Sequence, residues 1–151
     1  MRLAALVRPE LIFPELPGSD RATVLRALSE RLAAASLVEE VDDLYRRLSE
    51  REELGSTGVG SGVAIPHCKL NGLETGVVAI GLSHQGVDFG TADGEPVKVF
   101  FLLVSPSESA AEHLQSLAAI SEWVKNNRHV EEILKLKDPQ SIYELLLSEV
   151  V

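Results

Sequence analysis

The sequence contains a single cysteine, Cys68, among its 151 residues. One thiol excludes an internal disulfide framework, and a chain without disulfides fits a reducing compartment, so we expect a cytoplasmic protein. Aromatic residues are also few, at 5%, but the chain is 45% hydrophobic and 25% charged. That composition is typical of an ordinary globular protein and excludes the disordered and fibrous classes.

Basic residues are scarce as well. The chain has 14 Lys and Arg against 23 Asp and Glu, which gives a formal net charge of -9 at pH 7. Such a chain repels a phosphate backbone and lacks the concentrated positive charge that releases counterions from nucleic acid. We therefore expect no nucleic-acid partner.

Long apolar runs are missing. Arg8 and Glu10 interrupt the apolar N-terminal stretch, and the longest run elsewhere extends only from Val99 to Val104. A membrane-spanning helix needs about 20 predominantly apolar residues, and a signal peptide needs a longer uninterrupted apolar segment than the one here. We therefore expect no direct membrane insertion.

The length of the chain is that of one compact domain, which can bury a core without disulfides or metals. The sequence shows no internal repeat, low-complexity segment or linker. Residues 1–151 are therefore predicted to form a single domain.

Apolar residues recur at helical spacing near both ends of the chain. The N-terminal part predicts helices over about 20–36, capped by Ser19 or Asp20, and over about 40–51, which places Arg51 near a helix C-terminus. The C-terminal part predicts a helix from Ser109 to about Asn126, a short one over 129–136, and a last one that begins at Asp138 and Pro139.

The start of the helix at Ser109 carries a further expectation. Ser109 and Glu112 have the spacing of a capping box, and His113 then lies in the first turn or just past it.

Three β-branched or apolar runs lie between the helices, at 63–66, 76–82 and 96–104, with a turn-rich stretch over 84–95. The run from Val97 to Val104 predicts a central strand that is buried on both faces. Residues 55–62 contain four glycines, a density that predicts a tight loop without regular structure. Helices at both ends with strands between them predict an α/β sheet covered by helices.

His67 directly follows the run Val63 to Pro66, and the glycine-rich loop directly precedes that run. Pro66 restricts the direction in which His67 leaves the strand, and the glycines let backbone N–H groups approach an anion. Imidazole suits phosphoryl relay, because one bare nitrogen attacks while an acceptor holds the proton on the other. Candidate groups for stabilising a phosphoryl group are Arg51, Ser56, Thr57 and His113.

These residue types leave other interpretations open. A histidine after a strand is often a turn residue, and Arg51 in a charged cluster is often a solvated helix end. A metal site made of His67, Cys68 and His113 has only three ligands, whereas structural zinc sites usually have four. His84 and His129 match no motif and are expected at the surface.

Two segments resemble the type 2 IIA domains of the phosphotransferase system, which include the fructose, mannitol and nitrogen-related proteins. They are Arg51 to His67, REELGSTGVGSGVAIPH, and Glu112 to Trp123, EHLQSLAAISEW. The first is closer to the nitrogen-regulatory sequences than to the mannitol ones. The resemblance implies a mixed β-sheet flanked by α-helices on both faces. One departure is Cys68, where glycine is common in the family.

The resemblance also implies a site and its partners. His67 would accept a phosphoryl group on Nε2 from the phosphohistidine of HPr or its nitrogen-branch counterpart, with His113 beside it and Arg51 on the phosphoryl group. Ser56 and Thr57 would assist in binding phosphate, and neither a metal nor another cofactor is expected.

The sequence carries no IIB or membrane IIC segment, which favours a protein that acts in phosphorylation-dependent regulation. The alternatives are a separate IIA subunit that passes phosphate to a IIB component for fructose- or mannitol-type sugar uptake, and a metal-binding or purely structural interaction domain.

Overall fold

The computed structural model describes residues 3–148, and residues 1–2 and 149–151 lie outside its description. A six-stranded sheet forms its centre. The strands are β1 (Val7–Phe13), β2 (Gly58–Gly60), β3 (Val63–Ala64), β4 (His67–Leu70), β5 (Val77–Val87) and β6 (Val97–Pro106). Their order is β1-β5-β6-β3-β2, and β4 continues along β6 beyond β3. The β5–β6 and β2–β3 pairs are antiparallel and the others are parallel, so the predicted mixed sheet is confirmed.

Strand β6 is the buried centre of this sheet. Its residues from Val99 to Val104 have no measurable exposure to solvent. Because successive side chains of a strand point to opposite faces, Phe101 and its alternate neighbours enter one apolar cluster, whereas Phe100 and its alternate neighbours enter the other. The prediction of a central strand buried on both faces is confirmed.

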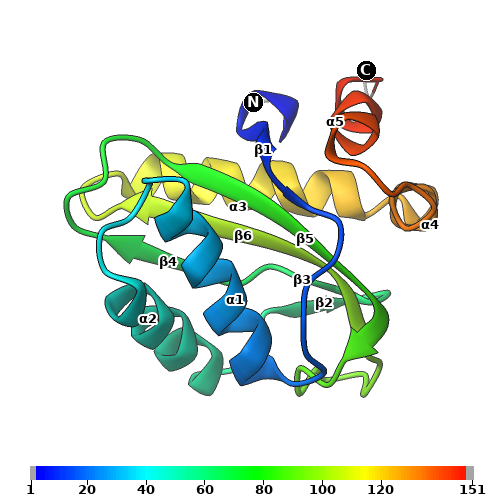
Figure 1. Cartoon of the computed structure of the whole chain (residues 1–151), viewed down its shortest axis with the longest axis horizontal. Coiled ribbons are helices and arrows are strands. Elements are labelled where there is room, and N and C mark those ends of the chain that lie inside the picture. Colours follow the sequence, from blue (N-terminus) through cyan, green and yellow to red (C-terminus); the bar gives the residue numbers. More distant parts are fainter. Residues whose placement is uncertain (1–2, 149–151) are drawn as a thin grey trace.

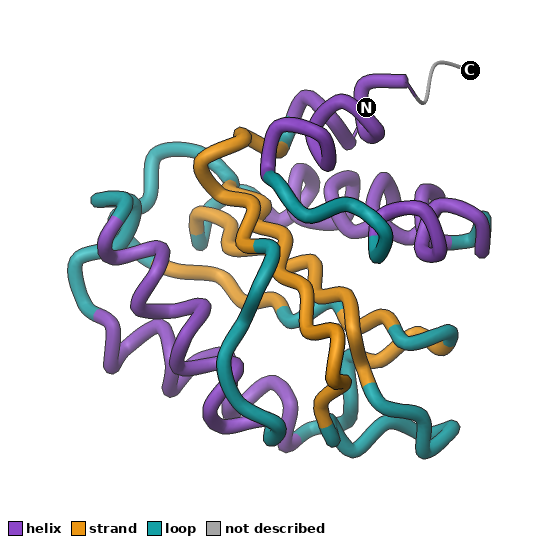
Figure 2. Tube along the Cα trace, turned by 45° about the vertical axis from the view of Figure 1, so that its right-hand side comes forward, coloured by secondary structure: helices purple, strands orange, loops and turns teal. Residues whose placement is uncertain are grey.

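Helices cover both faces of the sheet, as predicted. Figure 2 shows the strands between two groups of helices. Helices α1 (Arg21–Ala34) and α2 (Val41–Glu53) pack on the Phe100 face. The Phe101 face is covered by α3 (Ala110–Val124), α4 (Asn127–Ile133), α5 (Pro139–Ser148) and the short 3-10 helix η1 (Leu3–Ala5). In Figure 1, η1 and α5 lie side by side, and α2 lies beside β4.

The edges of the sheet differ from the sequence prediction. Strand β1 was not expected, because Arg8, Pro9 and Glu10 break its apolar pattern. In the described sheet, β1 lies at an edge and pairs with β5 alone. An edge strand tolerates proline, because one side of it makes no ladder hydrogen bonds. Strand β5 also continues to Val87, past a register shift after Leu82, into a stretch expected to be turns.

The segment around the glycine-rich loop also differs. Gly58–Gly60 forms strand β2, so the prediction of no regular structure over 55–62 is wrong for this part, because backbone pairing needs no side chains. The predicted strand over 63–66 stops at Ala64, and a new strand begins at His67 itself. The break contains Pro66, which has no N–H to donate to a neighbouring strand.

The helix ends test the predicted caps. Asp20, not Ser19, caps α1 by accepting a hydrogen bond from the Thr23 N–H at 2.8 Å. Asp138 accepts one from the Ser141 N–H at 2.9 Å at the start of α5. Ser109 occupies the N-cap position of α3 but makes no side-chain cap bond, so the predicted capping box is wrong.

Helix α4 begins earlier than predicted, at Asn127, and ends at Ile133, because Asn126 caps it through the Arg128 N–H at 3.0 Å. Within residues 3–148, no helix is long and apolar enough to cross a membrane. The assignment of residues 1–151 to one domain stays a prediction.

Candidate functional site

The structure brings together Arg51, His67 and His113, which lie far apart in sequence. His67 begins β4 and pairs with Leu103 of the central strand β6. Arg51 lies in the last turn of α2 and His113 in the first turn of α3. All three line one open cavity of about 580 Å³, together with Arg47, Glu50, Glu53, Leu54, Cys68 and Lys69.

Two contacts fix the orientation and the tautomer of the His67 ring. Nδ1 lies 2.6 Å from the carbonyl oxygen of Ile65. A carbonyl only accepts hydrogen bonds, so Nδ1 carries the proton and donates it. The bare Nε2 then accepts a hydrogen bond from Nε of Arg51 at 3.3 Å. The nitrogen with the free lone pair is therefore the one that faces the cation.

His113 is the third side chain of the site, together with His67 and Arg51. Its ring centroid is 5.6 Å from that of His67, and its Nδ1 is 2.7 Å from the hydroxyl oxygen of Ser105 at the end of β6. His113 is only 6% exposed. Ser105 was not among the site residues predicted from the sequence. The only feature that could have indicated it is its position as a polar residue directly after an apolar run.

Burial keeps both imidazoles neutral near pH 7. Burial, together with the electrostatic effect of the nearby His67 and Lys69, lowers the pKa of His113 to about 4. Burial also lowers the pKa of His67, and the Arg51 cation acts in the same direction. The hydrogen bond to Ile65 and the Glu52 carboxylate oppose this shift. A neutral His67 keeps the lone pair that a nucleophile needs.

Ser56 and Thr57 do not line the cavity that contains His67. The Ser56 hydroxyl oxygen accepts a hydrogen bond from the Gly58 N–H at 3.0 Å, and the buried Thr57 hydroxyl donates to a carboxylate oxygen of Glu52. Direct phosphate binding by these two residues stays a prediction. Glu52 was not predicted either, because nothing in its charged sequence context distinguishes it from its neighbours.

Cys68 follows His67 and is half-buried. Burial raises the pKa of its thiol to about 12, which disfavours the thiolate that acts as a metal ligand. Among residues 3–148, no group of three His, Cys, Asp or Glu side chains is arranged to hold a metal ion.

The two remaining histidines behave differently from each other. His84 is exposed, as predicted, and its Nε2 lies 3.0 Å from the Leu134 carbonyl oxygen. The prediction of a surface position is wrong for His129, which is 7% exposed. Its Nδ1 contacts the Trp123 carbonyl oxygen at 2.7 Å, and its ring stacks on the Trp123 ring.

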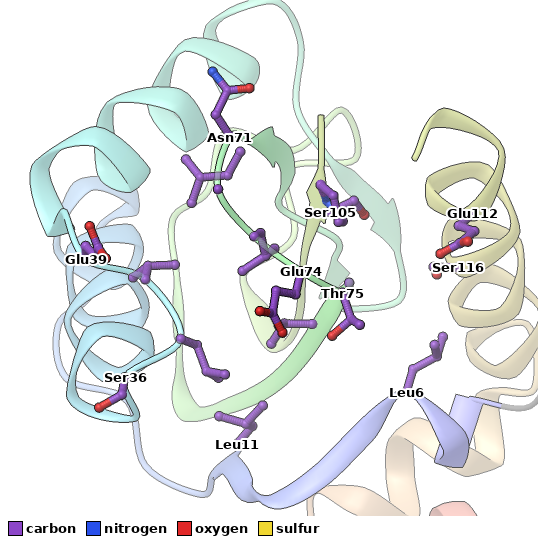
Figure 3. A pocket seen from close by; sticks show the side chains of 18 of the residues that line it. Leu6, Leu11, Ser36, Glu39, Asn71, Glu74, Thr75, Ser105, Glu112 and Ser116 are labelled. Atoms are coloured by element: carbon purple, nitrogen blue, oxygen red, sulfur yellow. The ribbon is translucent and has the colours of Figure 1, made fainter. Parts of the chain in front are cut away.

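A second, larger cavity of about 820 Å³ lies away from His67 (Figure 3). Exposed acidic side chains, among them Glu39, Glu74 and Glu112, lie around it. Ser105 lines this cavity, and it contacts His113, which lines the smaller one. The larger cavity contains neither His67 nor Arg51, and its size alone does not make it the candidate site.

The low pKa of His113 predicts how stability changes with pH. The unfolded chain binds the imidazole proton near pH 6.5, whereas the folded chain binds it only near pH 4. Stability from this group is therefore complete above pH 6.5 and is lost as the pH falls toward 4, by about 2 kcal/mol between pH 7 and pH 5. Denaturant unfolding at both pH values should show a smaller loss in His113→Gln than in wild type. The exposed His84→Gln is the control, and equal losses in all three proteins would contradict the prediction.

Known proteins resemble this chain over most of its length. Residues 5–149 match the family model described as "Phosphoenolpyruvate-dependent sugar phosphotransferase system, EIIA 2". The chain is 35% identical over 146 residues to a nitrogen regulatory protein of Bradyrhizobium diazoefficiens, which covers 97% of this chain and 95% of the relative. It is 32% identical over 142 residues to a PTS system fructose-specific EIIA component of Haloferax volcanii, which covers 94% and 92%.

Solved structures share the fold. The nitrogen regulatory protein IIA-Ntr of Neisseria meningitidis superimposes with a TM-score of 0.87 at 25% identity, covering 95% of this chain and 98% of the other. Enzyme IIAMTL of Escherichia coli, solved in complex with phosphorylated enzyme IIBMTL, has a TM-score of 0.76 at 18% identity, covering 95% and 98%, and shows the likeness of fold alone. With the family match extending over nearly the whole chain, this protein belongs to the type 2 EIIA family of the phosphoenolpyruvate-dependent sugar phosphotransferase system.

Proposed function

We propose that this protein is a phosphocarrier that accepts a phosphoryl group on Nε2 of His67. The observation that carries the proposal is the hydrogen bond of Nδ1 to the Ile65 carbonyl, which leaves Nε2 unprotonated, with its lone pair directed at Nε of Arg51. The donor is a phosphohistidine protein, HPr or its nitrogen-branch counterpart, as the family resemblance implies.

The transfer step balances without a further reactant. The Nε2 lone pair attacks phosphorus, and the P–N bond of the donor breaks so that its electron pair returns to the donor imidazole. The His67 proton stays on Nδ1, where the Ile65 carbonyl stabilises the positive charge that the ring acquires. Passing the phosphoryl group on reverses these steps with an acceptor as the nucleophile.

The surrounding residues supply electrostatic stabilisation. Phosphoryl transfer has a loose transition state, so catalysis depends on positioning and on charge near the transferred oxygens. The Arg51 guanidinium is held in place because its Nη1 donates to the Gly55 carbonyl at 2.8 Å. The neutral His113 ring lies 5.6 Å from His67, and it offers a further N–H donor on Nε2 when its Nδ1 accepts the hydrogen bond of the Ser105 hydroxyl.

This assignment predicts one acid-labile phosphoryl group on His67. Incubation with phosphoenolpyruvate, enzyme I and HPr should add the mass of a single phosphoryl group to the wild type and to His84→Ala. His67→Ala should fold and stay unlabelled, because it lacks the attacking nitrogen. Labelling of His67→Ala at the wild-type rate would exclude His67 as the acceptor.

Removing either neighbour should slow transfer without abolishing it. One lost charge-stabilising contact typically costs about 2.7 to 4 kcal/mol in the transition state, so Arg51→Ala and His113→Ala should transfer roughly a hundredfold more slowly. Quenched-flow labelling with phospho-HPr measures the transfer rates. The matched control is Arg128→Ala, because Arg128 is exposed on α4. Wild-type rates in both variants would show that neither residue acts on the phosphoryl group.

We propose further that the phosphorylation state of this cytoplasmic protein regulates its partners. Leu54 and Leu114 are 85% and 66% exposed; Leu54 lies three residues after Arg51, and Leu114 directly follows His113. A partner that buries these side chains against the unmodified site would meet nearly two additional negative charges after phosphorylation, which raises the cost of desolvation. The likeness to nitrogen regulatory proteins supports this function. The likeness to a fructose-specific EIIA component supports the alternative, transfer to a IIB component.

Regulation predicts a partner that binds only the unmodified protein. A pull-down from cell extract of the source organism, with unphosphorylated and phosphorylated protein as baits, should recover it in the first case and not in the second. His67→Ala, treated with the same donor proteins, should retain the partner. If the only phosphorylation-sensitive partner were a sugar-specific IIB protein that rapidly accepted the phosphoryl group, the transport function would be correct instead.

A further inference from the structure

Glu52 is a buried carboxylate next to the site. It lies in the last turn of α2, directly after Arg51, and only 2% of it is exposed. A buried carboxylate is costly unless hydrogen bonds compensate for its lost hydration. Both compensating bonds come from one residue, Thr57, whose N–H donates to Oε2 at 3.0 Å and whose hydroxyl donates to Oε1. The Glu52–Thr57 pair therefore ties the end of α2 to the glycine-rich segment.

From Thr57, a chain of backbone bonds leads to His67. The Thr57 carbonyl accepts the Ile65 N–H at 3.0 Å. The Ile65 carbonyl in turn accepts Nδ1–H of His67 at 2.6 Å. The group that sets the tautomer of His67 is thus held by the residue that binds Glu52.

From Glu52, the other branch leads through Arg51 to the same ring. Nη1 of Arg51 donates a hydrogen bond to the carbonyl oxygen of Gly55, which lies between Glu52 and Thr57 in sequence. Nε of Arg51 donates to Nε2 of His67. The contacts therefore form a closed circuit that begins and ends on the two nitrogens of the His67 imidazole.

We propose that the Glu52–Thr57 pair is the positioning element of the site: it holds the Ile65 carbonyl on Nδ1 of His67 and the Arg51 guanidinium on Nε2. The proposal rests on the phosphocarrier function above. Neither member of the pair lines the cavity with His67, and Thr57 is only 5% exposed, so both act through Arg51 and Ile65. This gives Thr57 a role different from the direct phosphate binding expected from sequence, because its hydroxyl is already bonded to Glu52.

Four variants separate positioning from general stability. Thr57→Val keeps the shape of the side chain but removes the hydroxyl, and Thr57→Ser restores it. Glu52→Gln keeps the shape of Glu52 but removes its charge and one acceptor oxygen. Thr75→Val, in the exposed turn between β4 and β5, makes the same exchange away from the circuit and is the control.

Transfer from phospho-HPr is measured against donor concentration. Thr57→Val and Glu52→Gln should lower the saturating rate about tenfold or more, because a small misplacement of reacting groups has a large effect on rate. The half-saturating donor concentration should not change, since buried side chains do not contact the donor. Thr57→Ser and Thr75→Val should keep the wild-type rate.

The tautomer of His67 is measured separately, by nitrogen-15 NMR of the unphosphorylated protein. The wild type, Thr57→Ser and Thr75→Val should show a single form with the proton on Nδ1, whereas Thr57→Val and Glu52→Gln should show a mixture with the proton on Nε2 in part. This readout does not depend on transfer. If wild-type His67 were not labelled, that result would contradict the phosphocarrier function. The NMR spectra would still decide whether the Glu52–Thr57 pair positions the ring.

Three results would overturn the proposal. They are wild-type rates and spectra in folded Thr57→Val or Glu52→Gln, a change in half-saturation alone, and failure of Thr57→Ser to recover both readouts. Circular dichroism checks that each variant is folded. If Thr57→Val does not fold, Glu52→Gln and Thr57→Ser decide between the outcomes.

Discussion

The double-sided burial of strand β6 is the constraint on which the rest of the structure depends. Its residues between Val99 and Val104 are sealed from water by α1 and α2 on one face and by α3, α4 and α5 on the other. The same strand aligns both histidines, because Leu103 pairs with His67 and the Ser105 hydroxyl contacts His113. A central strand that cannot shift register without exposing apolar side chains therefore gives the two imidazoles a fixed separation.

The chemistry of the site follows from placing neutral rings beside cations in an acidic protein. The chain carries a net charge of -9, yet the three cations that line the cavity with His67 outnumber its two carboxylates, Glu50 and Glu53. Burial keeps the imidazoles unprotonated, so His67 keeps its lone pair beside the Arg51 guanidinium, whereas Arg47 is paired with Asp43 at 3.3 Å. Local charge, and not the charge of the whole chain, suits this face to a phosphoryl group.

Elements with strong periodicity could be predicted from the sequence, and elements set by pairing could not. The helices at 20–36 and 40–51 and the buried strand at 97–104 were predicted because their apolar spacing follows from packing on one or two faces. Strand β1 was missed because only pairing with β5 makes VRPELIF a strand. His129 was placed wrongly for a similar reason, since its stacking on Trp123 is a tertiary contact without a sequence pattern.

The sequence by itself determined the family, through the segment from Arg51 to His67 and the later segment around His113, and it determined the α/β class through its periodicities. It also made the Nδ1 contact of His67 possible, because the accepting carbonyl of Ile65 is only two residues away. Only the tertiary structure decided the direction of Arg51, the Ser105 partner of His113 and the Thr57 partner of Glu52. These depend on distances between α2, α3 and β6, which form only when the two apolar faces of the sheet are covered and their helices come to lie beside one strand end.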